Sequence, residues 1–153
     1  MSDWLSAEGA AALLALVGAA EAGARDEVPV GAVLTDALGR ILGVCGNLCV
    51  SNADPVGHAE MRVMRQVARC LDNYRLTATR MAVSLEPCPM CREAASLARV
   101  DQIRFAARRE GGFAEVVDPF LAQDAEYGAS SVALLQFFFS ERRADLNSSG
   151  KSV

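Results

Sequence analysis

Apolar residues near the start of the chain recur at the spacing of a helix. Leu13, Leu16, Val17 and Ala20 lie on one face of an Ala- and Leu-rich stretch over residues 5–24. Spacings of three and four residues predict an amphipathic helix with these residues on its apolar face. A glycine near the end of the stretch and a proline shortly after it fit a helix stop.

Two short apolar runs follow, at residues 28–35 and 40–45, with four residues of turn composition between them. Runs of this length around a short turn predict a β-hairpin. The first run is almost continuously apolar, as expected of a strand that is buried on both faces. Residues 46–57 contain Asn, Asp, Pro and Gly and are predicted to form a loop.

The middle of the chain alternates between helical and strand patterns. Helices are predicted from residue 58 to about 73 and over 88–99, and strands at 79–84 and 102–107. Arg62 lies off the apolar face of the first of these helices and is expected in solvent. The order helix, strand, strand, helix, strand, helix, strand favours a three-layer α/β/α sheet with helices on both faces.

The C-terminal third has a weaker pattern. Residues 113–123 indicate a helix that is interrupted at Pro119, and no fifth strand is predicted there. A further helix is predicted over 130–143, where apolar residues again recur at helical spacing. Residues 147–153 have the composition of a disordered tail. We therefore expect a single domain over residues 1–146.

The composition is that of an ordinary globular chain. Of the 153 residues, 52% are hydrophobic and 22% are charged. No apolar run approaches the ~20 residues of a membrane span, and the first residues lack the basic region of a secretory signal. With five cysteines, which suit a reducing compartment, we expect a cytoplasmic protein without a membrane partner. The net charge of −4 argues against a surface covered with nucleic-acid contacts, but it leaves room for a local basic patch.

The most informative residues are those of Pro87–Cys91, together with His58 and Glu60. Cys88 and Cys91 are three residues apart and can share the first turn of a helix. His58 is the only histidine of the chain. Two thiolates and one imidazole leave the fourth position of a tetrahedral zinc ion open for water, which is typical of a catalytic site. We therefore predict a Zn²⁺ ion bound by His58, Cys88 and Cys91, with Glu60 beside it.

Three other interpretations of these residues are open. Two cysteines at this spacing can form a thioredoxin-like redox pair, in which the upstream histidine and glutamate have no part. A structural zinc site with Cys45, Cys49 or Cys70 as the fourth ligand would leave Glu60 without a role. His58 could also be an ordinary hydrogen-bonded histidine. The three remaining cysteines are most simply buried, reduced thiols.

The pattern H-x-E followed by P-C-x-x-C is the signature of zinc deaminases. On these residues, and on stretches 27–33, 73–76, 84–88 and 133–143, the sequence resembles the cytidine/deoxycytidylate deaminase superfamily. Within it, the sequence is most similar to the bacterial tRNA-specific adenosine deaminases. The resemblance implies the same α/β/α fold, hydrolytic deamination of a nucleobase, and a homodimer that pairs near the zinc helices. Met90 and Leu97 could contribute to that pairing.

The chemistry gives the site residues expected roles. Zinc lowers the pKa of a bound water to about 7, and Glu60 is the expected catalytic residue that transfers protons between this water and the base. By resemblance, Asn47 positions the base, since an amide suits a ring edge. A role in capping the loop fits Asn47 equally well. Val30 and Phe139 are the other expected substrate contacts.

The substrate half departs from the tRNA-specific pattern. Arg109 stands where those deaminases usually carry an aspartate, the last connection is short, and Ser140 and Glu141 replace basic residues. We expect the wobble adenosine of a tRNA anticodon loop as substrate, because a single-stranded base can enter a pocket at modest cost. A free base or nucleoside (guanine, cytosine or cytidine) is one alternative, and a non-catalytic zinc-stabilised module is another. The arginines that could contact phosphates are Arg104, Arg108, Arg109, Arg142 and Arg143.

Overall fold

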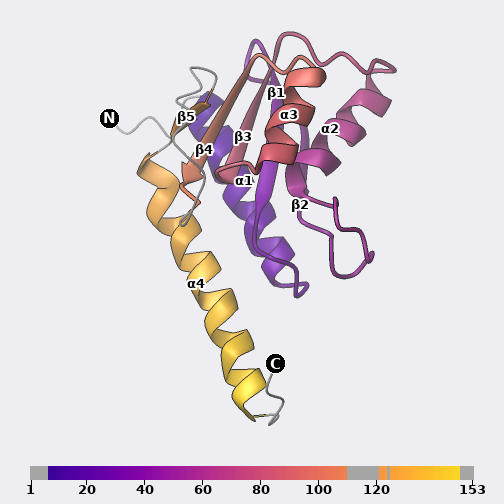
Figure 1. Cartoon of the computed structure of the whole chain (residues 1–153). Helices are drawn as coiled ribbons and strands as arrows, with labels where there is room; N and C mark the ends of the chain where they lie inside the picture. The colour runs from indigo at the N-terminus through magenta and orange to yellow at the C-terminus, as the bar shows by residue number, and fades with distance from the viewer. Residues whose placement is uncertain (1–6, 110–120, 124, 149–153) are drawn as a thin grey trace.

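The computed structural model describes residues 7–109, 121–123 and 125–148. Its elements (Figure 1) are α1 (Ala7–Gly23), β1 (Gly31–Asp36), β2 (Ile41–Gly46), α2 (Ala59–Cys70), β3 (Thr79–Leu85), α3 (Pro89–Leu97), β4 (Gln102–Ala107), β5 (Leu121–Gln123) and α4 (Ala125–Ser148). This is the order that the sequence predicts, with β5 as an additional strand.

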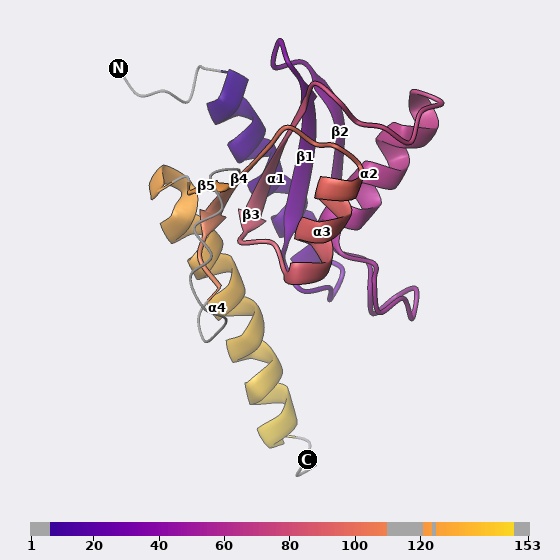
Figure 2. The same cartoon turned by 45° about the horizontal axis from the view of Figure 1, so that its top comes forward.

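The five strands form one mixed sheet in the order β2-β1-β3-β4-β5. Strand β1 pairs antiparallel with β2 and β3, whereas β4 is parallel to β3 and to β5. Helices α1 and α4 lie on one face of the sheet, and α2 and α3 lie on the other (Figures 1 and 2). The predicted three-layer α/β/α architecture is confirmed.

The larger core lies between the sheet and the pair α2 and α3. Ala32 and Leu34 of β1 belong to this core together with Val63 and Val67 of α2. Val33 points the other way, into a second cluster with residues of α1. Successive side chains of a strand point to opposite faces. The continuous apolar run of β1 therefore reflects burial on both faces, as predicted.

Helix α1 packs on the sheet through its small residues. Ala15 and Ala19 are buried, whereas Leu13 and Val17 are 40% and 50% exposed. The prediction that the larger side chains form the buried face is therefore wrong. The reason is the close approach of the two backbones. A Cβ atom on Gly31 of β1 would lie 2.1 Å from the carbonyl oxygen of Ala15 and 2.5 Å from the nitrogen of Ala19, so only small residues fit there.

The C-terminal part differs most from its prediction. Leu121–Gln123 form strand β5, which pairs with Ile103–Phe105 of β4, where the sequence indicated the end of an interrupted helix. Three residues are too few for periodicity to reveal a strand. Residues 110–120, which hold the rest of that predicted helix, lie outside the described residues. Helix α4 extends beyond the predicted 130–143 at both ends and includes the first two residues of the predicted tail.

Three smaller predictions also need correction. Strand β1 begins at Gly31 rather than at residue 28, because Pro29 has no N–H group and the N–H of Val30 donates to the nearby carbonyl of Val28. Of the three cysteines predicted to be buried outside the metal group, Cys45 is buried, Cys49 is half-buried and Cys70 is exposed at the end of α2. Arg62 is half-buried rather than solvated, and its guanidinium donates a hydrogen bond to the carbonyl of Gly46. Among the helices described, none is long and apolar enough to span a membrane.

Candidate active site

The two halves of the sequence motif meet at two helix N-termini. His58 immediately precedes α2, and Cys88 immediately precedes α3. Cys91 lies in the first turn of α3, where Pro89 occupies a position at which its missing N–H costs nothing. The positive ends of two helix dipoles therefore lie beside the cysteines, where they favour thiolates.

The three predicted ligand atoms lie at the spacing that a metal requires. His58 Nδ1 is 3.6 Å from Cys88 Sγ and 3.5 Å from Cys91 Sγ. Bonds of about 2.3 Å to sulfur and about 2.0 Å to nitrogen, at a tetrahedral angle, would place nitrogen and sulfur roughly 3.5 Å apart. The donor atoms therefore fit a tetrahedral zinc ion. No other His, Cys, Asp or Glu among the residues that the structure describes belongs to this group, so the four-ligand structural site lacks its fourth ligand.

The electrostatics of the group also fit a cation. Burial raises the pKa of the Cys91 thiol, and the charges of Glu60 and Cys88 raise it further. Two thiolates and a carboxylate enclosed together repel one another unless a positive ion lies among them. A divalent metal that accepts sulfur and nitrogen ligands, such as zinc, supplies that charge.

Glu60 lies in the first turn of α2 and is only 3% exposed. Burial raises the pKa of its carboxyl group. A hydrogen bond from its own backbone N–H, the His58 ring, a hydrogen bond with Cys91 and the charge of Arg109 offset part of that rise. A buried carboxyl with a raised pKa beside a metal group can accept a proton and return it.

Asn47 caps α2 from a distance in the sequence. His58, at the N-cap position, makes no capping hydrogen bond with its own side chain. Instead, Asn47 Oδ1 accepts the N–H of Ala59 at 2.9 Å, and the N–H of Asn47 donates to the carbonyl of Val30 at 3.0 Å. The sequence allowed a role in capping the loop, and the structure shows this side chain capping helix α2. The amide nitrogen of Asn47 takes no part in this bond.

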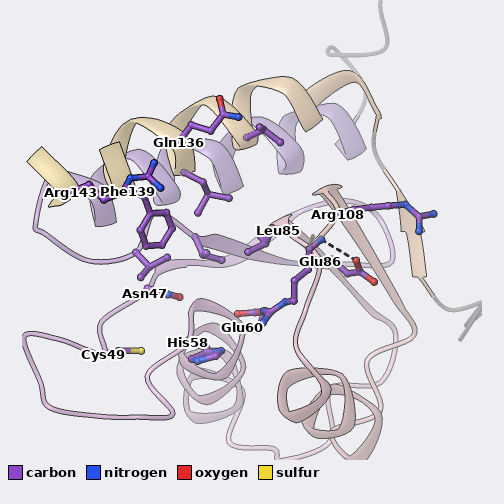
Figure 3. A pocket seen from close by; sticks show the side chains of 15 residues that line it. Asn47, Cys49, His58, Glu60, Leu85, Glu86, Arg108, Gln136, Phe139 and Arg143 are labelled. Carbon is purple, nitrogen blue, oxygen red and sulfur yellow. Dashed lines mark hydrogen bonds between the residues drawn. The ribbon is translucent and has the colours of Figure 1, made fainter. Parts of the chain in front are cut away.

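A cavity of about 600 Å³ opens beside His58 and Glu60 (Figure 3). Asn47, Val30 and Phe139, which the sequence predicted to contact the substrate, all line it. Helix α4 forms the wall of the cavity that lies across from His58 and Glu60 (Figure 3). The cavity therefore has a zinc side, at the start of α2 where His58 lies beside Cys88 and Cys91, and a substrate side, formed by loop 46–57, the residues before β1, and α4.

Some cavity residues are absent from the prediction. Leu85 and Glu86 lie at the end of β3, and Gln136 lies on α4. Topology could have indicated the first two, because ligands of α/β sheets bind at the carboxyl ends of the strands. The backbone N–H of Arg109, just after the parallel strand β4, donates to Glu86 at 3.2 Å and joins the two strand ends.

The arginines that the sequence offered for phosphate contacts do not all reach the cavity. Arg108, Arg109 and Arg143 line it, with Arg108 and Arg143 at opposite ends (Figure 3). Arg104 instead pairs with Glu8 of α1 and lines a separate hollow of about 230 Å³.

Arg142 is also engaged elsewhere. Its guanidinium donates to the carbonyl of Asp26 and lies 4.4 Å from the centre of the Phe138 ring. It therefore fixes α4 to the turn after α1 and is not directed at a ligand.

Comparison with known proteins agrees with this site. Residues 7–107 match the model of the cytidine and deoxycytidylate deaminase zinc-binding region. The chain therefore belongs to this family of zinc-dependent hydrolases, and the family resemblance found in the sequence is confirmed.

Individual relatives extend the likeness over most of the chain. The sequence is 38% identical over 143 residues to the tRNA-specific adenosine deaminase of Agrobacterium fabrum, which covers 86% of this chain and 93% of that protein. A structure from work on A-to-I editing by tRNA:A34 deaminases has a TM-score of 0.74 and 34% identity, over 83% of this chain and 99% of that one. Guanine deaminase from Bacillus subtilis has a TM-score of 0.62 and 32% identity, over 65% of this chain and 64% of that one.

Proposed function

We propose that this protein hydrolyses the amino group of adenosine at the wobble position of a tRNA anticodon, which gives inosine and ammonia. The observation that carries this proposal is the 38% identity to a tRNA-specific adenosine deaminase over 86% of this chain and 93% of that protein. The three-ligand metal group and the buried carboxyl of Glu60 supply the chemistry that such a reaction needs.

His58, Cys88 and Cys91 would hold the zinc ion, which supplies a polarised water as the nucleophile when bound. Glu60 takes one proton from the attacking water and delivers it to the ring nitrogen next to the carbon that carries the amino group. The same carboxyl then moves the second water proton to the amino group, which leaves as ammonia. The burial of Glu60 keeps solvent from competing for these protons.

The substrate side orients the base in this proposal. The amide nitrogen of Asn47 donates to the ring edge, while Oδ1 stays on the N–H of Ala59. Val30 and Phe139 pack against the faces of the ring, which favours a planar aromatic substrate.

The charge of the residues that line the cavity supports a polynucleotide substrate. The chain carries a net charge of −4, yet three exposed arginines, Arg108, Arg109 and Arg143, line one cavity. The acidic residues of the same cavity are Glu60 and Glu86. A few phosphate contacts are enough for a base that is already unpaired in a loop.

A free purine base is the second candidate, because a guanine deaminase is 32% identical over 65% of this chain. Arg109, in place of the usual aspartate, also weakens the tRNA-specific pattern. The test is ammonia release from an adenine-containing anticodon stem-loop, measured in parallel with a panel of free bases and nucleosides. We expect salt-sensitive turnover of the stem-loop alone. Turnover of guanine with an inert stem-loop would overturn the proposal.

We also propose a cytoplasmic homodimer that pairs through α3. Leu97 on this helix is 72% exposed, and Met90 is half-buried beside the zinc group. The free thiols of the chain suit a reducing compartment. Light scattering at micromolar concentration should give twice the chain mass of 16.2 kDa, and the mass of one chain would contradict the dimer.

A further inference from the structure

A second buried carboxylate, Glu27, has no part in the zinc chemistry. It lies in the turn between α1 and β1 and is 0% exposed. Glu27 Oε2 accepts the N–H groups of Cys49 and Val50 at 2.9 Å each. Glu27 Oε1 accepts the N–H of Ser51 at 2.7 Å and the hydroxyl of Ser51 at 2.8 Å. We call these four residues the Glu27 cluster.

The cluster holds a charge rather than a neutral acid. Burial acts to raise the pKa of Glu27, but the hydrogen bonds from Ser51, Val50 and Cys49 outweigh it and lower the pKa to about 2. Three consecutive backbone N–H groups converge on one carboxylate, an arrangement that suits an anion and leaves a neutral side chain poorly matched. The loop therefore depends on the ionised form of Glu27.

The segment that Glu27 holds is part of the cavity wall. Cys49 lines the cavity, and so does Asn47 two residues earlier. Asn47 Oδ1 in turn accepts the N–H of Ala59, the residue between His58 and Glu60. A series of direct hydrogen bonds and short chain segments thus runs from Glu27 to the first turn of α2.

The turn that contains Glu27 also contacts helix α4, which forms another wall of the cavity. Asp26 has a left-handed backbone with φ of 60°, and its carbonyl accepts the hydrogen bond from Arg142. Arg142 is followed by Arg143 on α4, which lines the cavity. The residues after Glu27 lead directly to Val30, a third wall residue. Three walls of the substrate side therefore meet at residues 26–27.

We propose that Glu27 is a positioning residue for deamination, which holds residues 49–51 so that Asn47 faces the base and caps α2 at the same time. This inference rests on the proposed function, because the contact between Asn47 and the base belongs to it. If Glu27 only anchored the loop, its replacement would lower the stability of the loop, and the contacts of Asn47 with the base and with Ala59 would be unchanged.

The direct test replaces Glu27 by glutamine, which keeps the shape and removes the charge. The amide NH₂ of Gln would face backbone N–H groups, which are also donors, so some hydrogen bonds of the Glu27 cluster are lost. We expect kcat/KM on the stem-loop to fall about 10- to 100-fold, the effect of one or two unsatisfied buried groups, with one zinc per chain retained. The matched control is Asp54→Asn in the same loop, because the Asp54 side chain accepts the nearby N–H of Val56 and is not among the described residues that line the cavity. Its activity should stay within about twofold of the wild type.

A double-mutant cycle shows whether Glu27 acts through Asn47. In an Asn47→Ala background, Glu27→Gln should cost less than threefold, because the group that Glu27 positions is already missing. An equal cost in both backgrounds would overturn the proposal. Ser51→Ala removes one of the four hydrogen bonds and serves as a milder variant if Glu27→Gln does not fold. It should lower kcat/KM about two- to tenfold in the wild type and have little effect in Asn47→Ala.

Amide hydrogen exchange separates this inference from the proposed function, because it needs no substrate. In zinc-loaded Glu27→Gln, exchange should be faster at residues 49–51 and also at Ala59. Faster exchange at 49–51 with Ala59 unchanged would overturn the link to the active site. If the wild type released no ammonia from the stem-loop while Ala59 still responded, the proposed substrate would be wrong and the link from Glu27 to α2 would stand.

Discussion

The zinc side and the substrate side of the cavity are held together by different kinds of contact. On the zinc side, His58 and Cys88 occupy equivalent positions just before two helices, and Cys91 follows within one turn. On the substrate side, side chains reach backbone groups that are far away in the sequence. The bonds of Asn47 with Ala59, Glu27 with Cys49, and Arg142 with Asp26 span 12, 22 and 116 residues.

This difference indicates where each property of the enzyme can change. Ligand positions on the zinc side follow from helix geometry, so the metal group is either present or lost. The substrate side depends on several separate hydrogen bonds, each of which can change without loss of the metal. Of the departures from the tRNA-specific pattern, Ser140 and Glu141 lie on α4, which belongs to the substrate side. Arg109 instead follows β4, and its charge acts on Glu60 of the zinc side.

The largest effect is expected from removal of a zinc ligand. Cys88→Ser should lose nearly all of its zinc and all measurable deaminase activity, because a serine hydroxyl does not ionise at neutral pH as a thiol does in a metal site. Metal analysis of the purified protein measures this. Cys70→Ser is the matched control, since Cys70 is exposed and lies outside the metal group. Full zinc content in Cys88→Ser would contradict the assignment.

The second-largest effect is expected from Glu60, the predicted proton-transfer residue on the zinc side. Glu60→Gln should keep its zinc but turn over at least ~10²–10⁴-fold more slowly, because the amide cannot transfer protons. Its stability should not fall, since burial already disfavours the charged form of Glu60 and raises its pKa. Steady-state kinetics with zinc analysis measure both outcomes. Glu86→Gln, another carboxyl of the same cavity, should cost less. Activity of Glu60→Gln within threefold of the wild type would rule out the proton-transfer role.

The same contrast explains what the sequence could predict. The only histidine, two cysteines one helical turn apart and a glutamate two residues from the histidine define a metal group through residue type and spacing alone. The structure brings the three predicted ligands together. The order of the elements along the chain was also predictable as far as β4, because β1 to β4 are long enough for their apolar runs to be recognised.

The substrate side could be predicted only in part. Asn47, Val30 and Phe139 were predicted as substrate contacts and line the cavity, but no local pattern connects Glu27 with residues 49–51. The buried alanines of α1 were missed because backbone proximity, rather than side-chain size, selects them. Pairing with a distant segment decides such features, and pairing leaves no periodic signal in either segment.

Asn47 lines the substrate side of the cavity and also caps α2 on the zinc side, so its variants test both sides at once. Asn47→Asp keeps an oxygen that can cap α2 but loses the amide donor, whereas Asn47→Ala loses both. We expect both variants to lose activity by about tenfold or more. Only Asn47→Ala should also lose about 1 kcal/mol of stability, the typical value of a helix cap. Urea unfolding together with kcat/KM distinguishes these effects. Full activity in Asn47→Asp would show that Asn47 only caps the helix.

The last prediction is a pH dependence of stability that belongs to Glu27. Its pKa is about 2 in the folded protein, below the ordinary 4.5. A group with a lowered pKa contributes stability above its unfolded pKa, and this contribution is lost as the pH falls toward the folded value. The free energy of unfolding of the wild type should therefore exceed that of Glu27→Gln by about 1–3 kcal/mol at neutral pH.

That excess should shrink as the pH falls from about 4.5 toward 2, and it should stay constant near neutrality. Protonation of the zinc ligands in acid affects both proteins alike, so the difference between them isolates Glu27. Urea unfolding of the two proteins from pH 7 to pH 3 measures it. A difference that does not change over this range would mean that the hydrogen bonds of the Glu27 cluster do not depend on its charge, and the substrate side would then be anchored by shape alone.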